Sequence, residues 1–388
     1  MKTDADSQPG AAGAGEQREE IHGRPHSGSH ATAGAVAALC GAMLAMPAWA
    51  GPVEDHAFKV LPPIVRGNLA IFPVQSSHAY DASMLLTLDE GVRSGQVIVT
   101  EAGDERGLVR PGQTIAPQGG AEVNRLVLYN NSPRPLLLLA GEIVTGGKQD
   151  RVIGMDRIVP ANTGPIDLGV FCVEPGRWVA SSAKFGSMGA QMAQPSVRTP
   201  AMAEHDQNRV WENVRSSNAK MANNLSAGEA ASVGATTSYA KVFASPPIAK
   251  AVAEYGGAES EQAILRELRE KDAVGVVVAV DGHVEWADVF ASTDLLARYW
   301  PKLMRSYVAE AMTSGKDTAV PELHAAQTYM DRLGGGREVV ETEPNVFRRS
   351  DITGDGYRVF QLTALLPKTG FNVHITKILQ GADRAASM

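Results

Sequence analysis

The sequence contains few cysteines and no excess of basic residues. Only 2 of its 388 residues are cysteine, and the formal net charge is −7. This mild acidity argues against nucleic acid or an anionic membrane surface as the main partner. Removal of an N-terminal signal, described below, would leave Cys172 as the one cysteine, so no intrachain disulfide is expected.

Complete cofactor and catalytic motifs are also missing. The chain contains no dinucleotide-binding fingerprint, no H-E-x-x-H and no G-x-S-x-G. Gly141 and Gly146 have the spacing of a phosphate-binding loop, but Lys148 comes one place late and Gln149 replaces the Ser or Thr that would contact magnesium. His283 and Glu285 can share one face of a strand, but two such groups do not make a zinc site. We therefore expect no cofactor and no metal.

The composition is that of a globular protein apart from the N-terminus. Hydrophobic residues make up 44% and charged residues 20% of the chain, enough to form a sizeable core. Residues 1–30 are rich in Gly, Ser, His and Glu and have almost no large apolar side chains, so they predict a disordered leader.

Residues 31–50 are typical of a cleavable secretory signal. An uncharged apolar run from Ala31 to Met46 is followed by Pro47 and by the tripeptide Ala48-Trp49-Ala50, which suits signal peptidase. About 16 apolar residues fall short of the roughly 20 that span a bilayer, so no stable membrane anchor is expected. A lipoprotein anchored at Cys40 is the weaker alternative. The sequence thus predicts export to the periplasm or the extracellular space.

Apolar runs separated by Pro, Gly and Asn clusters predict an α+β fold with a β-rich, mixed or antiparallel core and peripheral helices. We expect strands at 69–74, 97–100, 125–129, 136–140, 151–159, 166–173, 359–366 and 372–379. We expect helices at 85–92, 203–222, 247–255 and 260–271, and a surface connection over 225–245.

The strongest local pattern is a hairpin followed by a long helix. Val274 to Val280 is an apolar, β-branched run, Asp281-Gly282 is a favoured two-residue turn, and His283 to Phe290 continues as the partner strand. Apolar residues at helical spacing from Leu295 to Ala311 then predict a helix with one buried face.

A glycine-rich turn full of charge follows the apolar run at Leu136 to Ala140. Gly146 and Gly147 would let the backbone approach a ligand, Lys148 and Arg151 could hold an anion, and Gln149 could orient it. Two acidic side chains of this segment, Glu142 and Asp150, could act as a base. The alternative is an ordinary β-turn with a solvated charge cluster.

A second turn combines Cys172, Glu174, Arg177 and Trp178. Together, the Gly-Glu-Ile-Val-Thr-Gly-Gly-Lys-Gln-Asp-Arg and Cys-Val-Glu-Pro-Gly-Arg-Trp segments resemble those of the ARPP-type family, the ARG and rhodanese-phosphatase-superfamily-associated proteins. The resemblance covers roughly residues 58–312 and implies a domain identity without a settled activity. Residues 313–388 are then expected to be a small C-terminal β-containing extension.

These patterns lead to three functional hypotheses. In the first, the turns at 141–151 and 172–178 line one pocket that binds a small polar or anionic ligand, with Glu142 or Glu174 taking protons if there is chemistry. In the second, the protein is a hydrolase using Glu174 or Cys172, the latter with His78, His205 or His283 as its partner. In the third, it is an envelope protein that acts through protein contacts.

Overall fold

A computed structural model describes residues 58–104, 108, 125–176, 181–187, 191–256 and 258–380, without side-chain detail at 232, 256 and 258–260. The predicted leader (1–30) and the predicted signal peptide (31–50) lie outside the described residues. Among the described helices, none is both long and apolar enough to cross a membrane.

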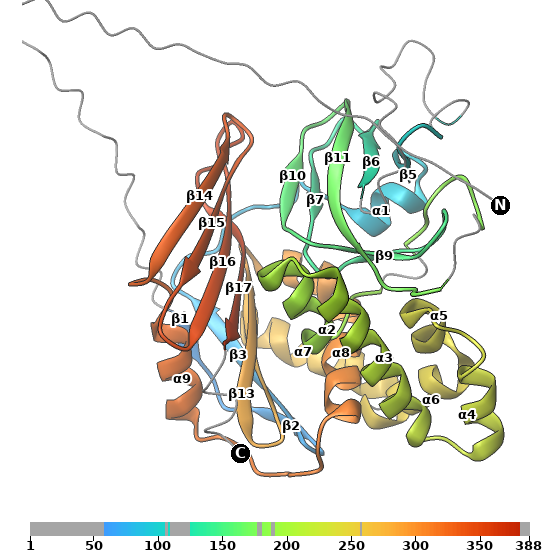
Figure 1. Ribbon diagram of the computed structural model, residues 1–388. Coiled ribbons are helices and arrows are strands. Elements are labelled where there is room, and N and C mark those ends of the chain that lie inside the picture. Colours follow the sequence, from blue (N-terminus) through green and yellow to red (C-terminus); the bar gives the residue numbers. More distant parts are fainter. Residues whose placement is uncertain are drawn as a thin grey trace, which may run out of the picture. The chain divides into compact units, whose positions relative to one another are not determined.

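The largest sheet is antiparallel and draws its strands from both ends of the chain (Figure 1). Its order is β1-β3-β12-β13-β17-β16-β15-β14, and β2 also pairs with β3. The strands are β1 (Phe58–Val60), β2 (Ile64–Arg66), β3 (Leu69–Ser76), β12 (Gly275–Val280), β13 (His283–Phe290), β14 (Arg337–Glu343), β15 (Phe347–Thr353), β16 (Tyr357–Ala364) and β17 (Asn372–Leu379).

The predicted hairpin is confirmed as β12 and β13, with Val280 paired to His283 across the turn. Asp281 and Gly282 both have positive φ, at 52° and 78°. Two positive φ values in succession match the right-handed twist of the flanking strands, and Asp-Gly is one of the residue pairs favoured in such turns.

Two smaller sheets lie beside the large one. The first has the order β10-β7-β4 and the second the order β5-β6-β11-β9-β8. Their strands are β4 (Leu86–Thr87), β5 (Val97–Glu101), β6 (Arg125–Asn130), β7 (Leu136–Leu138), β8 (Ile143–Val144), β9 (Arg151–Ile153), β10 (Arg157–Val159) and β11 (Thr163–Cys172). The single strand expected over 151–159 is two strands, because buried Asp156 turns inward and accepts a hydrogen bond from the Ala140 amide at 2.7 Å.

The helices occupy mostly the middle of the chain. They are α1 (Leu88–Arg93), α2 (Pro195–Thr199), the π-helix η1 (Pro200–Glu204), α3 (Gln207–Asn223), α4 (Ala227–Val233), α5 (Tyr239–Ala244), α6 (Pro246–Gly256), α7 (Ala258–Glu270), α8 (Thr293–Thr313) and α9 (Leu323–Asp331). The α+β class is therefore confirmed.

The expectation of a surface connection over 225–245 is wrong, because this segment forms α4 and α5. The small polar residues that suggested a loop are helix caps: Ser226 forms a capping box with Glu229, and the Ser238 hydroxyl accepts from the Lys241 amide. Four side chains of α5 are buried: Tyr239, Ala240, Val242 and Phe243.

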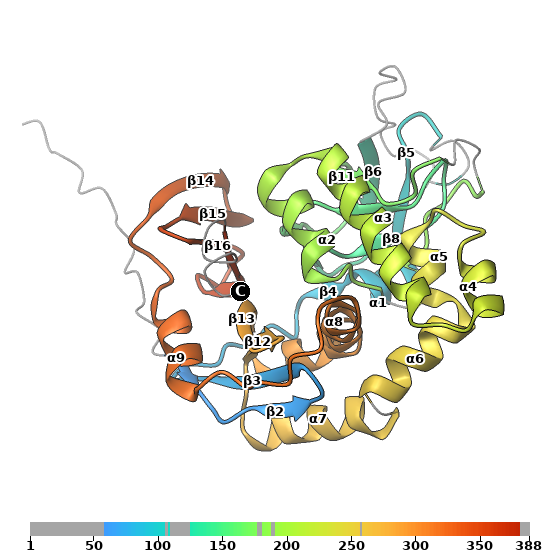
Figure 2. The ribbon, with the colours of Figure 1, turned by 60° about the horizontal axis from the view of Figure 1, so that its bottom comes forward.

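Helix α8 is buried along most of its length rather than lying at the periphery. Figure 2 shows it nearly end-on, between the large sheet and helices α2 and α3. Its buried residues include Leu296, Tyr299, Leu303 and Tyr307, and they belong to the largest hydrophobic cluster. Side chains of α8 can therefore contact both the sheet and the helical layer.

The C-terminal strands are part of the main architecture. Strand β17 pairs with β13, and β16, β15 and β14 follow it outward in the same sheet. The described residues on either side of position 313 belong to one compact unit. The large sheet thus continues past residue 312, after which the sequence predicted a separate extension.

Candidate functional site

The two turns singled out in the sequence are neighbours in space. Strand β9 pairs with β11, which places Arg151 opposite Cys172. The Val173 amide donates to the carbonyl of Asp150 at 3.0 Å, and the Asp150 amide donates to the Glu174 carboxylate at 3.1 Å. The segments therefore meet through strand pairing, which sequence spacing alone does not reveal.

The polar side chains of the first turn bind other protein groups. Asp150 accepts from the Gly146 amide at 3.1 Å and from the Ser238 hydroxyl at 2.6 Å. Gln149 donates to the carbonyl of Glu174 at 3.1 Å. The side chains of Gln149, Asp150 and Arg151 are at most 2% exposed, so most of this charge cluster is internal rather than solvated.

The two glycines of the turn adopt positive φ, 138° at Gly146 and 48° at Gly147. A Cβ atom on Gly147 would lie 2.3 Å from the Phe185 ring, and one on Gly146 would lie 2.6 Å from the Ser182 hydroxyl. Because glycine has no side chain, the 181–186 segment can pack directly against the backbone of the turn. Lys148 is half-buried, and its amide donates to Glu101 at 2.9 Å.

Glu142 points away from this turn into a buried triad. Its carboxylate and that of Asp89 both accept hydrogen bonds from Lys302, with the Glu142 contact at 2.5 Å. Burial raises the pKa of Glu142, while Lys302 opposes this effect. Burial disfavours the charged form of Lys302, but the two carboxylates outweigh it and raise the lysine pKa. In this arrangement Glu142 anchors α8.

The second turn contains the other candidate catalytic residues. Cys172 is fully buried, and burial raises the pKa of its thiol to about 11. Glu174 is also buried and lies 3.4 Å from the Lys241 ammonium. Arg177 and Trp178 lie outside the described residues. The ligand-binding and catalytic roles assigned to both turns stay predictions.

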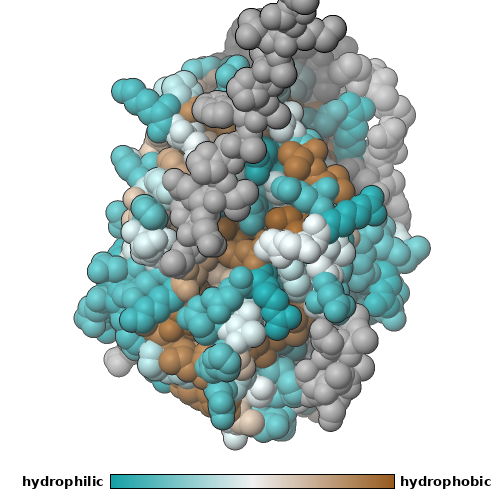
Figure 3. All heavy atoms as spheres, turned by 90° about the vertical axis from the view of Figure 1, so that its left-hand side faces the viewer, coloured by the Kyte–Doolittle hydropathy of each residue, from teal (hydrophilic) through white to brown (hydrophobic). Residues whose placement is uncertain are grey.

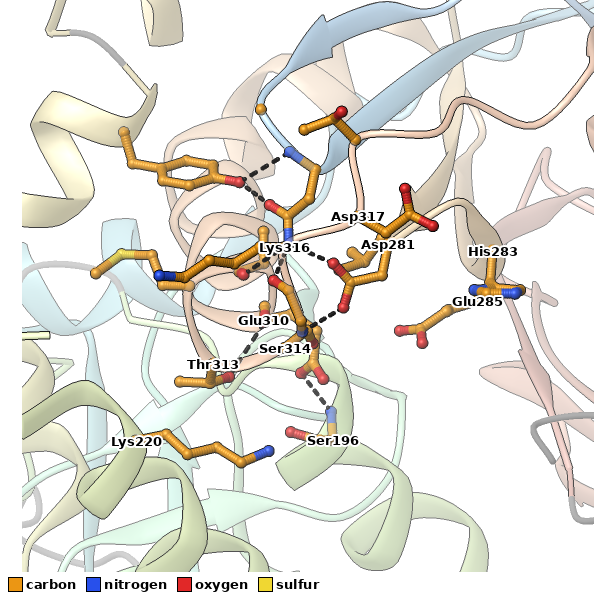
Figure 4. A pocket seen from close by; sticks show the side chains of 18 of the residues that line it. Ser196, Lys220, Asp281, His283, Glu285, Glu310, Thr313, Ser314, Lys316 and Asp317 are labelled. Atoms are coloured by element: carbon orange, nitrogen blue, oxygen red, sulfur yellow. Dashed lines mark hydrogen bonds between the residues drawn. The ribbon is translucent and has the colours of Figure 1, made fainter. Parts of the chain in front are cut away.

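A different part of the molecule contains a large hollow of about 1210 Å³ (Figure 4). One wall is the β12–β13 hairpin with Asp281, His283 and Glu285, and the opposite wall includes Lys220 of α3 and Ser196 of α2. Glu310 of α8 also lines it. The sequence predicted that His283 and Glu285 can share one face of a strand. Both residues line this hollow, which is consistent with that prediction.

Glu310 is held in one orientation by neighbours. Its Oε2 atom accepts from the Ser196 amide at 2.8 Å and from the Gln194 side chain at 3.2 Å. Gln194 is itself fixed, because its Oε1 atom accepts from the hydroxyls of Ser217 at 2.6 Å and Tyr239 at 3.3 Å. In the described part of the chain, no hydrogen bond engages the other carboxylate oxygen of Glu310, Oε1.

A hydrogen-bonded rim supports the hairpin side of the hollow. The side-chain amide of Asn68 donates to Asp281 at 2.8 Å and to the carbonyls of Ala311 at 3.0 Å and Gly315 at 2.8 Å. Asp281 also accepts from the Gly315 amide, and Tyr255 donates to Asn68. These bonds tie together β3, the hairpin and the end of α8, so the hollow is built by a connected frame.

Carboxylates outnumber cations in the lining of this hollow. The acidic residues are Glu254, Asp281, Glu285, Glu310 and Asp317, and the lysines are Lys220 and Lys316. A site with this balance favours ligands that carry positive charge. Apart from the hairpin residues, the sequence gives no sign of this site, because its members come from segments far apart in the chain.

A second charged cluster is closed to solvent. Asp288 binds Arg198 at 3.1 Å, Trp286 at 2.8 Å, Tyr307 at 2.5 Å and Thr376 at 2.9 Å. Burial alone would raise its pKa, but Arg198 and His374 outweigh this and hold it well below its usual range.

His374 lies between two carboxylates of the same cluster. It is 2.6 Å from Asp156 and 3.2 Å from Asp288. Burial alone would lower the pKa of His374, but the two carboxylates raise it to about 9. Asp156 also lines a smaller hollow of about 200 Å³, whose Arg349 is paired with Glu341. Asp156, Asp288 and His374 thus compensate one another's charge in the interior, as expected of a structural cluster.

No metal centre is seen in the part of the chain that the structure describes. There, no group of three or more His, Cys, Asp or Glu side chains is placed to hold an ion.

Comparison with known proteins identifies a family. The family model of the ARG and Rhodanese-Phosphatase-superfamily-associated Protein domain matches residues 57–376. This range includes β14 to β16 and most of β17, in agreement with the continuous sheet. No curated protein and no solved structure matches the chain.

Proposed function

Because the chain belongs to the family of the ARG and Rhodanese-Phosphatase-superfamily-associated Protein domain, a description that names an association and no reaction, we propose its function from geometry. The protein binds a small polar molecule that carries a positive charge, in the hollow of about 1210 Å³ at Glu310. This proposal concerns binding and includes no turnover.

The observation that carries the proposal is the half-engaged carboxylate of Glu310. This side chain is only 6% exposed, and its Oε2 atom is held by Ser196 and Gln194. A carboxylate that is fixed in position and keeps a second acceptor atom suits an ammonium or guanidinium group, because little side-chain entropy remains to be lost on binding.

The binding test uses calorimetry with named probes. We expect 1,4-diaminobutane, L-arginine or choline to bind, and glycerol and acetate to give no heat. Glu310→Gln should weaken binding of the cationic probe about 10- to 100-fold, because a charge-assisted hydrogen bond is lost. The substituted amide oxygen can still accept from Ser196, so the fold should be retained.

The matched control is Glu322→Gln, an exposed carboxylate outside the hollow. Equal affinity in the wild type, Glu310→Gln and Glu322→Gln would refute the proposed site. Binding of acetate in place of the cations would refute the proposed ligand class.

We keep the pocket expected at the 141–151 and 172–178 turns as a separate hypothesis with its own test. A polar or anionic ligand there should lose its stabilising effect in Lys148→Ala and Arg151→Ala while Glu310→Gln leaves it unchanged. The hollow is preferred because the side chains of Gln149, Asp150 and Arg151 are buried against protein groups.

The hydrolase hypothesis has less support. A thiol whose pKa is raised to about 11 is a poor source of thiolate near neutral pH. Glu174 is engaged by the Asp150 amide and by Lys241. A turnover screen on phosphoester, glycosidic and acyl substrates tests this alternative, and an activity lost in Glu174→Gln would establish it.

We also propose that the protein is exported. The support is the apolar run from Ala31 to Met46 followed by the Ala48-Trp49-Ala50 tripeptide. Mass spectrometry of the protein recovered from the periplasm or medium should give a chain that begins at Gly51. Ala50→Asp should block this cleavage, whereas an uncleaved wild-type chain that stays in the cytoplasm would disprove export.

A further inference from the structure

The outermost strand of the large sheet, β14, has one open edge. It pairs with β15 over all seven of its residues, from Arg337 opposite Thr353 to Glu343 opposite Phe347, without a shift in register. Within the described residues, no strand pairs with its other edge. That edge therefore presents a row of backbone N–H and C=O groups that another strand can bind.

The side chains of β14 are unusually exposed. Residues 337–342 are exposed and Glu343 is half-buried. Val339 and Val340 are 56% and 48% exposed, more than any other large hydrophobic residue in the described part of the chain. The strand contains no proline and no bulge, two common devices that prevent edge pairing.

The charges of β14 are complementary to those of a second β14 running antiparallel to it. With Val340 opposite Val340 of the second copy, Arg337 lies opposite Glu343 at both ends, and Glu338 lies opposite Thr342. A shift by one residue in one direction places Glu338 opposite Glu341, and a shift in the other places Glu338 opposite Glu343. Like charges directly opposite are destabilising, so only the Val340-centred register pairs all seven residues without such a clash.

We propose that two copies of this chain associate through β14, antiparallel, with Val340 on the two-fold axis. The large sheet of one copy then continues into that of the other. Such an interface is the same patch on both copies, as a two-fold axis requires.

In the part of the chain that the structure describes, the surroundings of β14 leave room for this pairing. Figures 1 and 2 show β14 at the end of the sheet with no described helix over its outer edge. Figure 3 shows that this side of the molecule mixes hydrophobic and hydrophilic surface. The Oε2 atom of Glu343 already accepts from Arg157 at 3.0 Å, so its other oxygen is the one that would accept from Arg337.

The expected association is weak. One strand edge is smaller than the roughly 1,200 Å² of a stable protein interface. We therefore expect a dimer that forms at high protein concentration and dissociates on dilution, which sedimentation velocity can follow.

A disulfide test reports the register directly. In the full chain carrying Cys40→Ala, Val340→Cys should form a disulfide-linked dimer under mild oxidation, because residues directly opposite have Cα atoms about 4.5–5.5 Å apart. Val339→Cys is the matched control, since its counterpart lies more than about 7 Å away in this register. Buried Cys172 should contribute little background. Equal cross-linking of both variants, or of neither, would overturn the proposal.

A charge exchange tests the pairing without oxidation. Arg337→Glu and Glu343→Arg should each weaken self-association several-fold, because each places like charges opposite at both ends. An equal mixture of the two variants should recover dimers near the wild-type level, because both ends are again paired as Arg and Glu. A mixture as monomeric as its components would refute the inference, as would a wild-type chain that is monomeric at every concentration.

Discussion

The glycine-rich turn at 141–151 and the hollow at Glu310 contain similar polar side chains in opposite environments. In the turn, Asp150 and Arg151 are at most 2% exposed, and Asp150 binds the Gly146 amide and the Ser238 hydroxyl. In the hollow, Lys316 and Asp317 are exposed. Among the described residues, none donates a hydrogen bond to the Oε1 atom of Glu310. The density of charged residues in a sequence therefore does not distinguish internal pairing from a binding surface.

Among the charged residues compared here, buried Asp288 should contribute most to the free energy of unfolding. Asp288→Ala leaves Arg198 buried without its partner, and we expect a loss of about 3–5 kcal/mol in the free energy of unfolding. Asp317→Ala, in the open hollow, should change it by less than about 0.5 kcal/mol. Urea denaturation measures the free energy of unfolding of both variants. Similar losses in the two would contradict the expected difference between a buried and an exposed aspartate.

His374 should make the buried cluster's contribution to stability depend on pH. His374 has a pKa of about 9 in the folded protein, above its ordinary value of 6.5. Its contribution is therefore fully present below pH 6.5 and is lost as the pH rises through about 9, by an amount on the order of 3 kcal/mol. Burial lowers the pKa of Lys377 to about 7, so that lysine changes stability in the opposite direction over the same range. The test is therefore the difference in the free energy of unfolding between the wild type and His374→Gln, which should shrink as the pH rises from 6 to 10. A difference that stays constant would remove His374 as the cause of this pH dependence.

Within the turn itself, Arg151 and Lys148 should differ. Arg151→Ala removes a buried side chain and should reduce the free energy of unfolding by about 2–3 kcal/mol. Lys148 is half-buried, and its side chain is not needed for the bond that its amide donates to Glu101, so Lys148→Ala should cost less than about 0.5 kcal/mol. Thermal unfolding in the absence of added ligand compares them. Equal losses would mean that Lys148 is as much a part of the packing as Arg151.

The smallest expected signal is the reactivity of Cys172. Because the thiol is buried and its pKa is raised to about 11, it should react with a disulfide reagent at pH 8 at least about tenfold more slowly in the folded chain than in urea. Absorbance of the released thiolate follows the reaction in the Cys40→Ala chain. Rapid labelling of the folded protein would restore Cys172 as a candidate nucleophile.

Local patterns predicted local structure well. The β12–β13 hairpin follows from two β-branched runs around Asp281-Gly282, and helix α8 follows from apolar spacing between Leu295 and Ala311. The same reasoning failed at 225–245, where serines that cap α4 and α5 look like loop residues. Strand β14 was also not expected, since it is exposed on both faces and has no alternation of apolar and polar residues.

The candidate site could not be read from the chain in the same way. Ser196, Lys220, Asp281 and Glu310 lie on four separate elements, and only the packing of α8 between the sheet and the helices brings them around one hollow. The sequence identified His283 and Glu285 as neighbours on one strand face, but it did not predict which segments lie opposite them.

The sequence by itself determined the family resemblance, the α+β class and the hairpin with its helix, because these depend on contacts between residues close along the chain. The tertiary structure decided which charges are internal and which line a hollow, because burial depends on distant segments. Glu142 shows the difference: it stands beside a glycine turn in the sequence, yet Lys302 on α8 draws it into the core. A carboxylate and an ammonium leave water together only where the fold brings them into contact.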